Sequence, residues 1–417
     1  MKATSRNRER PFLALKSILR KYSEFVAQPD VARLLAVAVV TRMPVGMVGF
    51  SMLMFLRESL GSFALAGTAV GANFVAAAIA APIQGRLIDR HGPARLLWFT
   101  GIIQPLALAC ILAGVKLHLP FAFIVGSAAC AGAFATPITT LTRAVWRQRF
   151  EREEDRRTAF ALDAVTIEIN FTAGPAIMAA ILATAGATAA FGVAIVAAAM
   201  AIGVFTLSPA LAYFRRETGV RRHLLGPLTE PRLWIVFGAT FGLTVAFGFL
   251  EVGYPAYATA LGVPAVGGLL LGINSLGSAL GGALYGGLHF KAPVERQFAA
   301  AMALMVIPLL LHAVVGPTAL FAAVAFLAGA LIAPSIAAQS TLVSRLAPSH
   351  YAAEAFTWSS TFIVSGLGAG MAIGGQIVER AGVRTPFAIG AAIVAAMAVL
   401  ALALVPARRV APARGND

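Results

Sequence analysis

The chain alternates long apolar runs with short connectors that hold most of its charged residues. Each run is about 20 residues long, the length that an α-helix needs to cross the hydrocarbon core of a bilayer, about 30 Å thick. We expect twelve membrane-spanning helices, at residues 33–56, 62–84, 96–115, 119–142, 158–184, 188–210, 233–254, 263–288, 297–315, 318–341, 353–378 and 385–406. The sequence therefore predicts an all-α membrane protein with little chain left for a soluble domain.

The composition excludes an ordinary soluble protein, because 59% of the residues are hydrophobic and 12% are charged, whereas soluble domains carry roughly 25% charged residues. The formal net charge of +15 would suit nucleic acid, but the basic residues follow the positive-inside pattern of membrane proteins. With a cytoplasmic N-terminus, 28 of the 33 Lys and Arg residues fall in cytoplasmic segments and four on the opposite side. We therefore expect an integral protein of a bacterial inner membrane, with both termini in the cytoplasm and no binding of nucleic acid.

The two halves of the chain resemble each other. The segment AGAFATP at 131–137 matches AGALIAP at 328–334, and residues 185–202 match 381–398. These matches predict two six-helix bundles, at 33–210 and 233–407, joined by a cytoplasmic loop at 211–232. A tail at 1–32 with an interfacial helix and a second tail at 408–417 complete the expected organisation. Duplicated halves of this kind are typical of transporters that rock around a site near the membrane midplane.

The connector between the second and third spans reads GRLIDRHGPARLL, at 85–97. Its pattern resembles the signature loop of the major facilitator superfamily, and the matching positions include Gly85, Asp89, Arg90, Gly92 and Arg95. The resemblance implies twelve helices in two pseudo-symmetric bundles and secondary transport by alternating access. It also implies that Asp89 docks at the N-terminus of the eleventh helix when the transporter faces outward. The loop can also be a solvated turn whose arginines only set the topology, with glycines that allow close approach and a sharp turn.

Few ionisable residues lie well inside the predicted spans: Arg42 in the first, and Asp163 and Glu168 in the fifth. Such a group costs at least about 2.5–3.5 kcal/mol at membrane depth, so it marks function by default. Arg42 and Glu168 lie about nine and ten residues from the cytoplasmic ends of their spans, and we expect them to form a buried ion pair. Arg42 can instead reach Asp163, which lies about 140° around the helix from Glu168 and shares a polar stripe with Asn170. We expect these residues to couple protons or contact substrate; a purely structural pair is the alternative.

Other positions suggest smaller roles. Gly174-Pro175 in the fifth span resembles part of the motif that antiporters of this superfamily carry, and it can bend the helix. Glu251, near the outer end of the seventh span, can contact a substrate or serve as an interfacial anchor. Polar residues elsewhere at membrane depth can line a cavity or serve in packing: Asn73, Asn274, Gln339 and Trp358.

The sequence carries no nucleotide-binding, metal-binding or nucleophile motif, and both cysteines fall inside predicted spans. We therefore expect no enzyme, no metal site and no cofactor, and an ion gradient, most simply of protons, as the energy source. The few charges in the expected cavity favour a neutral or amphiphilic small molecule as substrate. The sequence predicts a monomeric secondary transporter, embedded in the lipid bilayer, that exports such a molecule. The alternatives are proton-coupled uptake of a nutrient, metabolite or siderophore, and a membrane sensor or scaffold that transports nothing.

Overall fold

The computed structural model describes residues 23–208, 226–288, 290–348 and 351–405. Within these ranges the chain forms helices and short connectors, with no strand. The N-terminal half contains α2 (Pro29–Leu60), α3 (Phe63–His91), α4 (Pro93–Lys116), α5 (Phe121–Ala133), α6 (Ile138–Arg149) and α7 (Glu153–Thr206). The C-terminal half contains η2 (Gly226–Thr229), α8 (Pro231–Ala260), α9 (Val266–Gly287), α10 (Val294–Val314), α11 (Thr318–Leu346), α12 (Ala352–Ala381) and α13 (Thr385–Leu402).

Eleven segments of the described chain are long and apolar enough to cross a membrane. One of these combines α5 with α6, so the predicted span 119–142 is wrong as a single helix and is interrupted at 134–137. Another is α7, whose 54 residues would extend about 80 Å, far beyond the bilayer core. Its backbone leaves the helical conformation at Gly186, between the predicted spans 158–184 and 188–210. Because α7 supplies two crossings, the predicted twelve-helix fold is confirmed.

Three glycines reverse the chain between consecutive crossings in the same way. Gly92 (φ 78°, ψ 167°), Gly186 (φ 84°, ψ 171°) and Gly382 (φ 90°, ψ 165°) share one backbone conformation. A positive φ with ψ near 170° is essentially restricted to glycine, because a Cβ atom would clash with the backbone. Gly186 and Gly382 also occupy matching positions of the sequence repeat, so the two halves turn at the same point.

One helix contact occurs once in each half. Nδ2 of Asn73 on α3 donates a hydrogen bond to the carbonyl oxygen of Ala128 on α5, at 2.9 Å. Nδ2 of Asn274 on α9 donates to the carbonyl oxygen of Ala325 on α11, also at 2.9 Å. Each asparagine's backbone also packs against a glycine of the partner helix, in the same order: Gly132 and Gly329. The two halves therefore repeat one packing arrangement.

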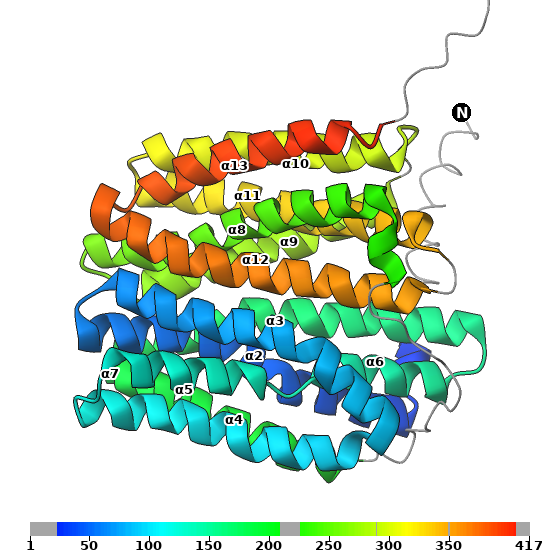
Figure 1. Cartoon of the computed structure of the whole chain (residues 1–417), viewed down its shortest axis with the longest axis horizontal. Helices are drawn as coiled ribbons and strands as arrows, with labels where there is room; N and C mark the ends of the chain where they lie inside the picture. The colour runs from blue at the N-terminus through cyan, green and yellow to red at the C-terminus, as the bar shows by residue number, and fades with distance from the viewer. Residues whose placement is uncertain (1–22, 209–225, 289, 349–350, 406–417) are drawn as a thin grey trace, which may run out of the picture.

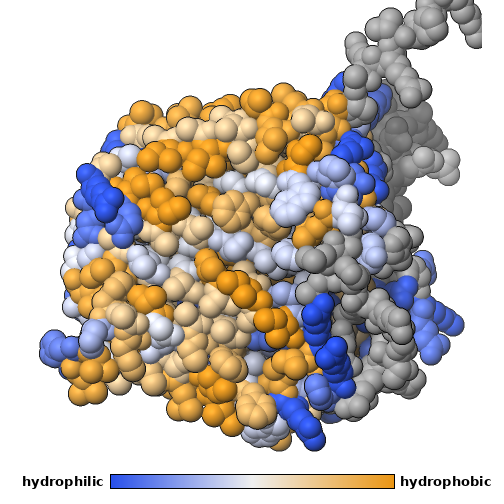
Figure 2. Space-filling model, in the orientation of Figure 1, coloured by the Kyte–Doolittle hydropathy of each residue, from blue (hydrophilic) through white to orange (hydrophobic). Residues whose placement is uncertain are grey.

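The halves lie side by side, with α8 to α13 in the upper part of Figure 1 and α2 to α7 in the lower part. Along the seam α3 packs on α12, and α7 packs on α9. Small residues let the backbones meet: a methyl group on Gly67 would lie 3.3 Å from the Cα atom of Gly375, and one on Gly268 would lie 2.7 Å from the carbonyl oxygen of Pro175. The visible sides are mainly apolar, and hydrophilic residues gather toward the two ends (Figure 2), as expected of a protein surrounded by lipid.

The contacts between the halves gather toward one end of the molecule. Oε2 of Glu379, at the end of α12, accepts hydrogen bonds from Oγ of Ser62 at 2.6 Å and from the backbone N–H of Ala64 at 2.9 Å. Glu379 thereby caps the first turn of α3 from the other half. We call this the distal end, and the opposite end, where α2 begins and α13 ends, the terminal end (Figure 1).

Candidate functional site

Arg42 and Asp163 form an ion pair between α2 and α7. Nη2 of Arg42 lies 2.8 Å from Oδ1 of Asp163, and the two side chains are 2% and 1% exposed. Nη1 of Arg42 donates a hydrogen bond to Oγ1 of Thr166 at 2.6 Å. The contact of Nη2 is not aligned as a hydrogen bond, and Nε of Arg42 has no acceptor among the described residues. The arginine therefore depends on one carboxylate for its charge compensation.

The crossing of α2 and α7 explains why these side chains meet. A methyl group on Gly174 would lie 2.7 Å from the carbonyl carbon of Gly46, and one on Gly46 would collide with the backbone oxygen of Asn170. Residues four apart share a face of a helix, so Arg42 lies one turn from Gly46 on the side of α2 that touches α7. The two glycines thus bring the arginine within reach of the polar stripe on α7.

Two residues of α6 also contact the carboxylate. Nε1 of Trp146 donates a hydrogen bond to Oδ1 of Asp163 at 3.2 Å, and Nε of Arg143 lies 3.4 Å from Oδ2. Trp146 is buried, whereas Arg143 is 56% exposed. The sequence interpretation missed both residues because it ended the fourth span at 142. Pro137, which precedes the first residue of α6, was the available signal, since proline favours a helix start over a helix interior.

The predicted pair of Arg42 with Glu168 is wrong, and the alternative pair with Asp163 is the one in the structure. The two carboxylates differ by only about 7.5 Å in depth, but they point about 140° apart around α7. Glu168, which is half-buried, lies one turn from Thr172, whose carbonyl oxygen faces Gly272 of α9. Glu168 therefore belongs to the side of α7 that faces the seam, away from α2.

The polar stripe of α7 faces α2. Oγ1 of Thr166 donates a hydrogen bond to the carbonyl oxygen of Asp163, and Nδ2 of Asn170 donates to that of Thr166, each at 2.8 Å. Asn170 is 2% exposed, and its Oδ1 atom has no hydrogen-bond partner in the part of the chain that the structure describes. The stripe therefore extends the buried polar environment of Arg42 toward the distal end.

Gly174 and Pro175 keep helical backbone angles, and Gly186 is the non-helical residue of α7. The structure gives Gly174 a different role from the predicted bend, because it is the contact point with α2. The carbonyl oxygen of Pro175 faces Gly268 of α9. At Gly174 and Pro175, α7 therefore contacts α2 of its own half on one side and α9 of the C-terminal half on the other.

The C-terminal half repeats the crossing without its charges. A methyl group on Gly248 of α8 would lie 2.7 Å from the Cα atom of Gly370 on α12, as between α2 and α7. When Gly248 is aligned with Gly46, Thr244 occupies the position of Arg42. When Gly370 is aligned with Gly174, Ser359 occupies the position of Asp163. Ser359 accepts a hydrogen bond from Nε2 of Gln339 at 2.8 Å. The ion pair is therefore a feature of one half that the architecture does not require.

The remaining polar candidates lie outside this pair. Asn73 and Asn274 each bond the backbone of a neighbouring helix in their own half, which is the packing role given as their alternative. Gln339 is buried against α12. Trp358 is half-buried, with its ring centroid 6.3 Å from that of Phe362.

The predicted gating loop is mostly helical. Gly85, Asp89 and Arg90 belong to α3, which continues to the residue before Gly92. Gly92 makes the expected sharp turn, whereas a methyl group on Gly85 would meet no atom of the described chain within 4 Å, so the expected close approach at Gly85 is absent here. Arg90 and Arg95 are exposed. The side chain of Asp89, and with it the predicted latch, lies outside what the structure describes.

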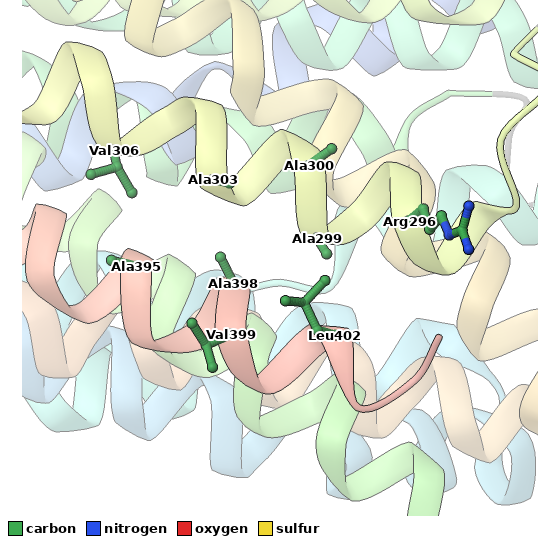
Figure 3. Close-up of a pocket in the computed structure, with 9 residues that line it drawn as sticks. All are labelled: Arg296, Ala299, Ala300, Ala303, Val306, Ala395, Ala398, Val399 and Leu402. Carbon is green, nitrogen blue, oxygen red and sulfur yellow. The ribbon is translucent and has the colours of Figure 1, made fainter. Parts of the chain in front are cut away.

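A separate apolar groove of about 380 Å³ lies between α10 and α13. Five of its nine lining residues are alanines, and Arg296 lies at one end (Figure 3). None of its lining residues belongs to α2, α6 or α7, so the groove is distinct from the ion pair. The complete lining is Arg296, Ala299, Ala300, Ala303, Val306, Ala395, Ala398, Val399 and Leu402.

The fold and the duplicated helix crossings agree with a family comparison. The profile of the Major Facilitator Superfamily matches residues 34–363 and 265–417. The chain belongs to the major facilitator superfamily. Several transporters with solved structures share the fold at 12–14% identity. The nucleoside transporter NupG has a TM-score of 0.72 at 12% identity, covering 90% of this chain and 99% of that one.

Two further transporters are similar. The POT family transporter PepTSo has a TM-score of 0.68 at 12% identity, covering 90% of this chain and 97% of that one. A bacterial homologue of the iron transporter ferroportin, in an inward-facing state, has a TM-score of 0.68 at 14% identity, covering 89% and 97%. Among curated protein sequences, none matches the chain significantly. At these identities the comparisons show a transporter fold and leave the substrate to the residues of the chain itself.

Proposed function

We propose that this superfamily member is a proton-coupled secondary transporter that exports an amphiphilic small molecule by alternating access. The terminal end faces the cytoplasm of a bacterium, because the basic connectors lie there, and the distal end faces outward from the inner membrane. A monomer suffices, the proton gradient supplies the energy, and no cofactor, metal or nucleic acid takes part. The observation that carries this proposal is the buried carboxylate of Asp163, which is shared among three helices.

Asp163 is suited to couple proton binding to movement. While it is charged, it compensates Arg42 on α2 and accepts the hydrogen bond of Trp146 on α6. Protonation would leave Arg42 as a buried cation without a counter-ion, at a cost of about 3–5 kcal/mol. A conformation that hydrates Arg42 or gives it another partner is then favoured by that amount. The other carboxylate oxygen lies beside Arg143, whose side chain is 56% exposed, so a proton on Asp163 can be released to water at the terminal end.

The distribution of contacts between the halves supports alternation around this pair. Glu379 and the glycines of α3, α9 and α12 hold the halves together toward the distal end. We therefore assign the structure to a state that is closed toward the outside. In the opposite state Asp89 would dock at the beginning of α12, in the role that the family resemblance implies. Smooth glycine surfaces along the seam suit the required rocking motion.

Proton coupling can be tested in proteoliposomes loaded with a pH-sensitive dye. A panel of amphiphilic compounds is added to the wild type, and proton movement that depends on the compound is recorded. Asp163→Asn should abolish this signal. Glu168→Gln is the matched control, because it removes the same charge from the same helix five residues away, and it should keep at least half of the signal. Undiminished coupling in Asp163→Asn would contradict the proposal.

The direction of coupling follows from the same vesicles. Export in exchange for protons predicts that the compound and the protons move in opposite directions across the membrane. Movement of both in the same direction would identify an uptake permease. A wild type that moves neither compound nor protons would support the sensor or scaffold interpretation.

A further inference from the structure

We propose that Glu251 on α8 binds the positively charged group of the transported molecule, so that the substrate class is an amphiphilic organic cation. This inference rests on the proposed transport function and names the substrate class. It also changes the expectation of a neutral or amphiphilic substrate, which came from counting the charges inside the membrane without knowing which of them are paired.

The first observation is that Glu251 keeps partial exposure on the most enclosed helix. In α8, 72% of the apolar window is buried, against 56% or less in the other described membrane spans. The neighbours of Glu251 along the chain, Leu250 and Val252, are 2% and 0% exposed. Glu251 itself is only half-buried, and because α8 offers little surface to lipid, its exposed part faces the interior of the protein.

The second observation is the direction of the side chain. A methyl group on Gly253 would lie 2.7 Å from the ring of Phe387, and one on Gly242 would collide with Met397, so this side of α8 faces α13. Glu251 is nine residues from Gly242, which is about 180° around the helix. The carboxylate therefore points away from α13 at the edge of the molecule and toward the N-terminal half.

Neighbouring residues define the rest of the surroundings. One turn away on either side, Gly248 packs on α12 and Pro255 packs against Gly267 of α9. Phe247, four residues toward the terminal end, is half-buried on the same face. When Gly248 is aligned with Gly46 of α2, the residue that corresponds to Glu251 in the first half is Gly49, which has no side chain. The first half therefore supplies no charge at the matching position.

The third observation is the charge balance. Arg42 already has its counter-ion in Asp163, and among the described residues no Lys, Arg or His forms a salt bridge with Glu251. A carboxylate without a counter-ion on an enclosed membrane helix is costly, so it acquires a proton or a cation. The adjacent ring of Phe247 adds an apolar surface and a π-face, which favour a cation with a hydrophobic body.

The test measures ligand binding to the purified protein in detergent, with no gradient and no transport. Tetraphenylphosphonium is the probe, because it carries a permanent charge and no proton, and triphenylphosphine oxide is the neutral control. The wild type should bind tetraphenylphosphonium at least tenfold more tightly than the neutral compound. Glu251→Gln should weaken binding of the cation at least tenfold and leave that of the neutral compound within twofold. Glu251→Asp keeps the charge and should keep most of the affinity, which separates loss of the site from loss of folding.

Glu58→Gln, which removes an exposed carboxylate near the distal end of α2, is the control and should bind the cation within twofold of the wild type. Equal affinity for the cation in wild type and Glu251→Gln would overturn the proposal. A wild type that does not prefer the cation would overturn it too, and would make Glu251 a proton site only. Because Asp163→Asn should still bind the cation, a failure of proton coupling and a failure of this site give different results.

Discussion

Replacing Asp163 by asparagine should destabilise the protein by about 3–5 kcal/mol, because Arg42 would keep its charge without a counter-ion. The side chain of Arg42 is 2% exposed, so water offers little compensation in this conformation. Arg42→Gln should cost less, about 1–3 kcal/mol, because the carboxylate would retain Trp146 and the exposed Arg143. The double variant should be more stable than Asp163→Asn alone, because it buries two neutral amides and leaves no net charge.

A double-mutant cycle measures this coupling. The free energy of unfolding is obtained for the four proteins from reversible unfolding in mixed micelles with increasing sodium dodecyl sulfate, followed by tryptophan fluorescence. The sum of the two single losses should exceed the loss in the double variant by about 3 kcal/mol, the upper end for residues in contact. A parallel cycle with Glu168→Gln in place of Asp163→Asn should be additive. Additivity within about 0.5 kcal/mol for Arg42 and Asp163 would refute the assignment of the pair.

Two further predictions concern the seam and the repeated helix contact. Glu379→Gln removes the charge that caps α3 from the other half, so the distal end should open more often. A membrane-impermeant maleimide should then label a cysteine introduced by Ala64→Cys several-fold faster than in the protein that keeps Glu379. An unchanged labelling rate would show that Ser62 and Glu379 do not hold the distal end closed. Asn73→Ala and Asn274→Ala should each lower the free energy of unfolding by about 1–2 kcal/mol. Both variants should bind tetraphenylphosphonium within twofold of the wild type. A tenfold loss of affinity in either variant would show that the asparagine contacts the substrate.

Helix length and the register of the repeat could be predicted well from the sequence. The length of an apolar run is set by the thickness of the bilayer, so eleven of the twelve predicted spans correspond to single crossings in the structure. The repeat placed Gly186 over Gly382, and both residues make the same turn. Span length depends on the thickness of the bilayer, and the glycine turns depend on local backbone conformation. Both can be inferred from a single sequence.

The partners of the site residues could be predicted only in part. Depth follows from counting residues, and it placed Arg42 near both carboxylates of α7. The choice between Asp163 and Glu168 depended on which side of α7 faces α2, and that is decided by the contact of Gly46 with Gly174. A sequence pattern gives the angle between two side chains on one helix, but it does not give the direction of the neighbouring helix.

The contribution of α6 shows a second limit. Trp146 reaches Asp163 because the fourth crossing breaks at 134–137 and restarts as a separate helix. The apolar run continues through the break, so hydropathy alone predicted one helix. Glu251 shows the same limit, since its exposure has meaning only once α8 is known to be enclosed by other helices.

The central claim is that Asp163 couples protons to the transport cycle, and comparison of exchange with accumulation tests it most directly. Proteoliposomes with Asp163→Asn are assayed for counterflow of a labelled substrate at equal pH and for substrate accumulation driven by an imposed pH gradient. If Asp163 carries the coupled proton, the variant retains counterflow and loses gradient-driven accumulation, while Glu168→Gln retains both. Gradient-driven accumulation at the wild-type rate in Asp163→Asn would contradict the account.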